Sequence, residues 1–125
     1  MVMIQYSLKL THVENSPELV SRLEDKFSQV TKFIHSDLNN AFAEIELEKT
    51  TEHHKQGDIF RAEINLKVGD GNFFRADATT SSLFSAIDDV KSKISKEVRR
   101  HYKKENDILR RSGRAMKKVL KGFRK

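Results

Sequence analysis

One hydrophobic core is the most that a chain of 125 residues, 37% of them hydrophobic and 34% charged, is expected to form. The absence of cysteine excludes a disulfide framework, thiolate metal sites and a cysteine nucleophile, and it fits a reducing cytoplasm. The formal net charge of +6 favours a polyanionic partner, either nucleic acid or an anionic membrane.

The beginning of the chain predicts a strand followed by a helix. Apolar and polar residues alternate over residues 4 to 10, which is typical of a strand with one buried face, and we expect this strand to end near His12. Ser16 can cap a helix with its hydroxyl, and Pro17 needs no amide hydrogen bond at the first helical position. Apolar residues then recur every three or four positions, so a helix is expected over about residues 17 to 34.

The rest of the chain predicts three strands and a second helix. Apolar residues alternate with polar ones over residues 43 to 48 and again over 60 to 68, so each of these strands should have one face in water. The sequence Gly-Asp-Gly-Asn at 69 to 72 is typical of a tight hairpin turn, and a fourth strand follows at 74 to 78. Apolar residues at helical spacing predict a helix over about 82 to 104.

The order of these elements, β-α-β-β-β-α, predicts the fold class. Three consecutive strands joined by hairpins form an antiparallel meander, and two amphipathic helices can cover its single apolar face. We therefore predict an α+β two-layer sandwich, in which a four-stranded sheet carries both helices on one face, resembling a double-stranded RNA-binding domain. Residues 1–104 would form this domain, and residues 105–125 a basic, mobile tail.

Positive charge is concentrated at the carboxyl end of the chain. Residues 1 to 102 hold 14 Lys or Arg against 16 Asp or Glu, whereas residues 103 to 125 hold 10 against 2. Each phosphate that a cation neutralises releases counterions, so this segment favours a polyanion. Its cations alternate with apolar residues, and a short amphipathic helix could form there on RNA or on a membrane surface. The sequence contains no run of about 18 consecutive apolar residues, so we expect neither a signal peptide nor a membrane span.

The second predicted helix carries cations on the side opposite its apolar residues. On a helical wheel, five of them form a basic ridge: Lys93, Lys96, Arg99, Arg100 and Lys103. Such residues usually form an ordinary solvated face of a helix. Few acids lie among these five, however, and this scarcity of acids favours phosphate binding. Arg22 and Lys26 flank the apolar stripe of the first helix, and they extend this surface only if the two helices lie side by side.

Other polar clusters predict no chemistry. His53 and His54 adjoin in a loop, but no further histidine lies at ligand spacing, so we expect no metal site. The strand residues Glu44, Glu46 and Glu48 are typical of a solvated sheet face, because no base, nucleophile or glycine-rich phosphate loop accompanies them. We therefore predict no enzymatic activity, no cofactor and no small-molecule substrate.

Three stretches of the sequence resemble the ribosome hibernation promoting factor and ribosome-associated inhibitor family. THVENSPEL at 11–19 resembles that family's link from the first strand to a proline-started helix, and LEKT at 47–50 resembles the end of its second strand. Residues 75–104, RADATTSSLFSAIDDVKSKISKEVRRHYKK, are similar to its fourth strand and to its last helix, which has Ala-Ile-Asp near the start and a basic end. The resemblance covers about residues 3 to 104, and the basic residues 105 to 125 depart from it.

This resemblance implies a cytoplasmic stress or stationary-phase protein that binds the small ribosomal subunit in the channel used by messenger and transfer RNA. Translation would stop by occupancy, without a reaction. We expect a monomer in solution whose partner is ribosomal RNA and not a membrane. The family's RNA-facing cations, together with the basic ridge and the basic helix end, give the candidate RNA-binding residues: Arg22, Lys26, Lys49, Lys91, Lys93, Lys96, Arg99, Arg100, Lys103 and Lys104.

The same features leave other interpretations open. A general double-stranded RNA-binding module would share the fold and the basic ridge but act away from the ribosome. Comparable affinity for a naked duplex and for ribosomes would favour that module. A membrane-surface protein or a small enzyme is supported only by the amphipathic tail and the acidic strands.

Overall fold

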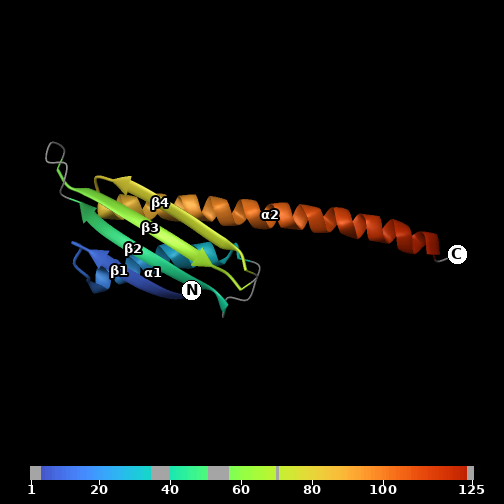
Figure 1. The fold of residues 1–125 in the computed structure, drawn as a ribbon, viewed down its shortest axis with the longest axis horizontal. Coiled ribbons are helices and arrows are strands. Elements are labelled where there is room, and N and C mark those ends of the chain that lie inside the picture. The colour runs from blue at the N-terminus through green and yellow to red at the C-terminus, as the bar shows by residue number, and fades with distance from the viewer. Residues whose placement is uncertain (1–3, 35–39, 51–56, 70, 124–125) are drawn as a thin grey trace.

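The sheet of the computed structural model has four strands in the order β1-β2-β3-β4 (Figure 1). The structure describes residues 4–34, 40–50, 57–69 and 71–123, with only the backbone for 105–123. Strand β1 (Gln5–Thr11) pairs in parallel with β2 (Phe42–Thr50), and β2, β3 (Ile59–Lys67) and β4 (Phe73–Thr80) form an antiparallel meander. This confirms the predicted meander and makes the complete sheet mixed.

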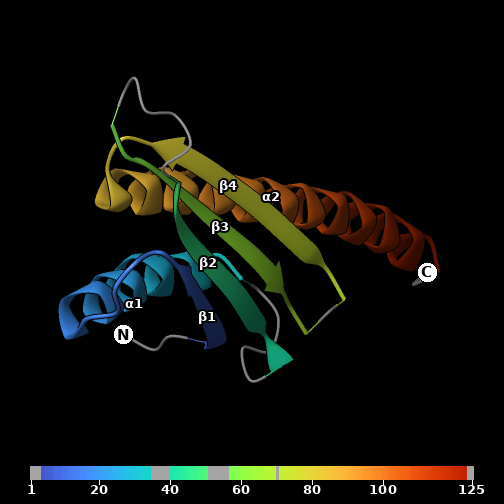
Figure 2. The same ribbon diagram turned by 60° about the vertical axis from the view of Figure 1, so that its left-hand side comes forward.

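Helix α1 (Pro17–Thr31) and helix α2 (Leu83–Phe123) lie on the same face of the sheet (Figure 2). The two-layer α+β architecture predicted from the sequence is therefore confirmed. The cap of α1 also forms as expected, because the amide of Leu19 donates to the hydroxyl of Ser16 over 3.1 Å.

Helix α1 is slightly shorter than predicted. The amides of Phe33 and Ile34 donate to the carbonyls three residues earlier, both over 3.1 Å, so the chain tightens after Thr31. Ile34 is nevertheless buried. The apolar stripe thus runs past the end of the α-helix, which is why periodicity alone extended it to residue 34.

Helix α2 is much longer than predicted. The expected end near residue 104 is wrong, since the helix continues to Phe123. A single internal glycine costs a helix only about 1 kcal/mol relative to alanine, so Gly113 does not end it. In Figure 1 the helix extends well beyond the sheet. The division into residues 1–104 and a separate basic tail stays a prediction.

The core lies between the inner face of the sheet and the two helices. Leu47 and Ile64 contribute from the sheet and Leu23 and Phe27 from α1. Of the α2 residues that the helical spacing predicted, Leu83 is partly buried and four are fully buried: Ile87, Val90, Ile94 and Val98. The turn between β3 and β4 is closed by two hydrogen bonds, from Val68 to Asn72 and from Gly71 to Val68. Gly71 has φ +89°, a conformation that glycine adopts without strain.

Candidate nucleic-acid interface

The two helices run in parallel, side by side, and three cations lie along their seam. The Arg22 guanidinium lies 4.3 Å from the centre of the Phe84 ring, and Lys26 Nζ lies 3.4 Å from Asp88 Oδ1. Farther along, the Arg99 guanidinium lies 5.1 Å from the Phe33 ring. The condition for the two helices to form one surface is therefore met.

The distal half of this surface is strongly basic. From residue 96 onward, five of the predicted α2 cations are exposed, and four of these have neither an ion pair nor a ring contact within the described residues: Lys96, Arg100, Lys103 and Lys104. The fifth, Arg99, has its partner in the Phe33 ring. Only Glu97 interrupts this stretch with an acid. Free ammonium and guanidinium groups on one solvated side can neutralise successive phosphates.

The other predicted cations are less available for binding phosphate. Lys93 is exposed, but its ammonium donates to the backbone carbonyl of Asp77 on β4 over 2.9 Å, on the side of α2 away from α1. Lys26 and Lys49 form ion pairs with Asp88 and Asp58, both at 3.4 Å, and Lys91 is half-buried. Lys49 lies at the end of β2 and Lys104 far along α2, so the ten candidates do not form a single cluster.

Helix α1 adds less positive charge than its sequence suggested. Its exposed side forms a shallow depression in which two acids lie among the cations: Glu18, Ser21, Arg22, Asp25 and Lys26. The basic character of the two-helix face therefore comes mainly from α2 after residue 91. Sequence reasoning also missed Phe33 and Phe84, whose only signal was that both are apolar yet lie outside the buried stripes.

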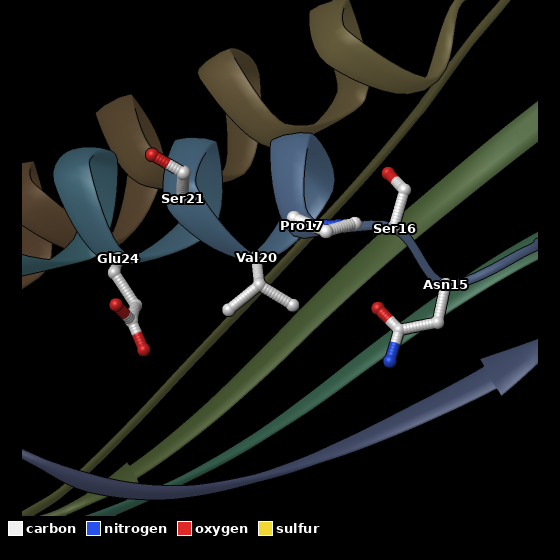
Figure 3. Close-up of a pocket in the computed structure, with 6 residues that line it drawn as sticks. All are labelled: Asn15, Ser16, Pro17, Val20, Ser21 and Glu24. Carbon is white, nitrogen blue, oxygen red and sulfur yellow. The ribbon is translucent and has the colours of Figure 1, made fainter.

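A second depression lies where the chain enters α1, shown in Figure 3, and its lining holds no cation: Asn15, Ser16, Pro17, Val20, Ser21 and Glu24. It does not belong to the basic surface.

Within the described part of the chain, no group of three or more His, Asp or Glu could hold a metal ion. None of its helices combines the length and the apolar character that a membrane span requires. His53 and His54 lie outside the described residues.

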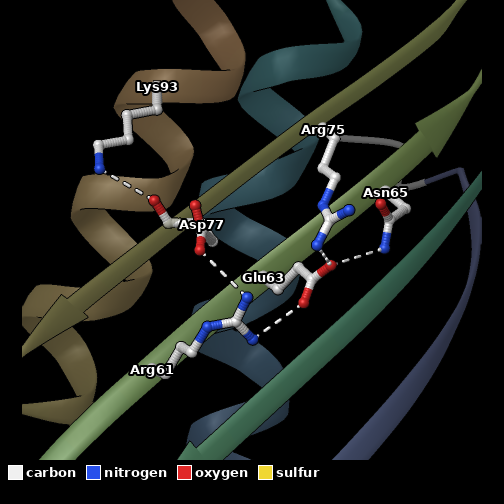
Figure 4. A network of polar contacts seen from close by, with 6 residues as sticks. All are labelled: Arg61, Glu63, Asn65, Arg75, Asp77 and Lys93. Atoms are coloured by element: carbon white, nitrogen blue, oxygen red, sulfur yellow. Dashed lines mark hydrogen bonds and ion pairs between the residues drawn. The ribbon is translucent and has the colours of Figure 1, made fainter.

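The uncovered face of the sheet has a different character, because its charges neutralise one another (Figure 4). Arg61 donates to Glu63 over 2.9 Å and to Asp77 over 3.1 Å, and Arg75 pairs with Glu63 at 2.9 Å. Asn65 adds a hydrogen bond to Glu63, which is only 9% exposed although no helix covers it. This network leaves the outer sheet face with few free cations for a polyanion.

The same network lowers the pKa of the Glu63 side chain. Burial alone would raise the pKa of Glu63, but hydrogen bonds from Arg61 and Asn65 and the charges of Arg61 and Arg75 outweigh it, so the pKa falls below the ordinary 4.5. The ionised carboxylate therefore stabilises the folded state above about pH 4.5. That contribution disappears as the pH falls through the lowered folded-state pKa.

We expect the substitution Glu63→Gln to cost stability at pH 7 and progressively less below pH 4.5, where the wild-type carboxylate also becomes neutral. Urea unfolding of both proteins across that range measures the difference in unfolding free energy. A difference that stays constant with pH would contradict the role of the ionised Glu63.

Comparisons with known proteins place this arrangement in a family. Residues 6–106 match the model of the sigma 54 modulation protein / S30EA ribosomal protein family. The Thermus thermophilus Protein Y N-terminal domain has a similar fold, with a TM-score of 0.66, 21% identity, and coverage of 79% of this chain and 99% of that one. A ribosomal subunit interface protein from Coxiella burnetii follows at 0.60 and 15% identity, covering 79% and 98%.

A search of curated protein sequences gave no match. The family match spans both helices and all four strands, from Tyr6 in β1 to the part of α2 that bears the basic ridge. It confirms the family resemblance that the strand ends and the basic helix indicated. The chain belongs to the sigma 54 modulation protein / S30EA ribosomal protein family.

Proposed function

We propose that this protein binds the small ribosomal subunit through ribosomal RNA and stops translation by occupying the channel of messenger and transfer RNA. The family supports association with the ribosome. The single observation that carries the RNA contact is the run of exposed cations on α2, from Lys96 to Lys104, without acidic partners in the described residues.

Occupancy needs no reaction, and the surface fits that role. The α1 side of the two-helix face has only a shallow, open depression, and on α2 the cations from Lys96 to Lys104 are exposed to solvent. Such a surface binds a backbone and does not enclose a small substrate. We therefore propose a non-enzymatic cytoplasmic protein, monomeric in solution, that acts under stress or in stationary phase.

Sedimentation tests this proposal. Purified protein mixed with small subunits should sediment with them at low salt, and the logarithm of the affinity should fall linearly with the logarithm of the salt concentration. In a translation reaction, protein added before messenger RNA should inhibit more than protein added after initiation. Protein that stays at the top of the gradient at low salt would contradict the proposal, and equal affinity for a naked RNA duplex would favour a general RNA-binding module.

A further inference from the structure

The two ends of the α1–α2 seam carry the same arrangement, with the helices exchanged. At one end Arg22 of α1 stacks on Phe84 of α2, and at the other Arg99 of α2 stacks on Phe33, just after α1. Both arginines are exposed. Neither has an acidic partner within the described residues, whereas Lys26, between them, is neutralised by Asp88.

An aromatic ring beneath a guanidinium group affects how that arginine binds a phosphate. The ring faces the guanidinium plane and attracts its charge, while the N–H groups at the edge of that plane stay available as a fork for a phosphate. A free arginine loses considerable side-chain entropy when it binds, and a stacked one has already lost much of it. The two rings therefore hold Arg22 and Arg99 in orientations ready for anions.

The distance between the two guanidinium groups can be obtained from the geometry of α2. Phe84, which holds Arg22, and Arg99 are fifteen residues apart on α2. At a rise of 1.5 Å per residue, the Cα atoms of Phe84 and Arg99 are about 22 Å apart along the helix axis, so the separation of the two guanidinium groups is on the order of 20 Å. One RNA backbone, or two neighbouring strands, must present phosphates at that separation to engage both.

We propose that Arg22 and Arg99 are the two oriented phosphate anchors of the RNA interface, and that Phe84 and Phe33 are positioning residues that act through them. The inference rests on the proposed function and deepens it, since it distinguishes directed contacts from general attraction. The ridge lysines supply long-range attraction without fixed geometry. The anchors set the register of the protein on the RNA.

The affinity of the full-length protein for purified small ribosomal subunits, measured over a range of salt concentrations, tests this inference. Phe84→Leu and Phe33→Leu keep every charge, so the slope of log affinity against log salt should stay unchanged. Each should nevertheless weaken binding about fivefold, because the guanidinium loses its platform. Phe84→Tyr and Phe33→Tyr keep an aromatic face and should bind like the wild type.

Phe73→Leu is the matched control, since Phe73 is an exposed aromatic residue of β4 on the opposite side of the protein, and it should not change the affinity. Wild-type affinity in both leucine variants would overturn the inference. So would a loss that tyrosine fails to rescue, which would indicate packing and not the ring. Failure of the wild type to bind subunits would instead overturn the proposed function.

Discussion

Replacing both Lys96 and Lys103 by glutamate is expected to lower the affinity for small ribosomal subunits about 100-fold, at roughly tenfold per reversed cation. Both side chains are exposed on the solvated side of α2, and neither has an ion pair within the described residues. Each reversal leaves one phosphate without its cation and adds repulsion. The slope of log affinity against log salt should therefore become shallower by about one for each phosphate that is no longer neutralised.

The control must change the net charge by the same amount on another face. Lys9 of β1 and Lys67 of β3 are exposed cations outside the two helices, and glutamate at both positions gives the same charge change. We expect only the small loss of affinity that general electrostatics produces. If both double variants bind equally poorly, net charge drives association and the basic ridge has no special role.

Phe27→Ala is expected to lower the free energy of unfolding by about 3–5 kcal/mol. Phe27 lies on the buried side of α1 and is only 2% exposed, so the truncation leaves a cavity between that helix and the sheet. Such a loss is a large part of the roughly 5–15 kcal/mol that a small domain has. Urea unfolding should show a lower midpoint with an unchanged slope.

The aromatic residue Phe73 provides the comparison for this change. It is 54% exposed, so Phe73→Ala should shift the unfolding free energy by no more than about 0.5 kcal/mol. Similar losses of stability in the two variants would show that Phe27 is not buried as described. Because α1 also carries Arg22, loosening this helix should weaken subunit binding as well.

Local patterns predicted most of the fold, because each strand has one wet face and each helix one apolar stripe. Residues 60 to 68 alternate cleanly, and the structure turns Ala62, Ile64 and Leu66 inward as that alternation requires. The parallel pairing of β1 with β2 could not be predicted in this way, since alternation shows which side chains are buried but not the direction of a neighbouring strand.

The length of α2 could not be predicted from apolar periodicity alone. Its first part is defined by burial against the sheet, and the sequence beyond residue 104 has helical spacing but contains glycine. Gly113 does not stop the helix, because the neighbouring residues are good helix formers and offset its cost.

The candidate surface was only partly predictable. A helical wheel shows which α2 cations lie in water, but it does not show what lies across from them. Lys93 contacts a backbone carbonyl of β4, and Lys26 contacts Asp88 from the other helix. The two arginine–phenylalanine pairs likewise join residues that are 62 and 66 positions apart, so only the tertiary structure brings them together.

A density map of the protein bound to the small ribosomal subunit tests the central claim most directly. We predict that the α1–α2 face lies against ribosomal RNA in the messenger and transfer RNA channel, with Arg22, Arg99 and the exposed cations of α2 within reach of phosphates. A map in which the sheet face contacts the RNA, while these cations point into solvent, would contradict the account.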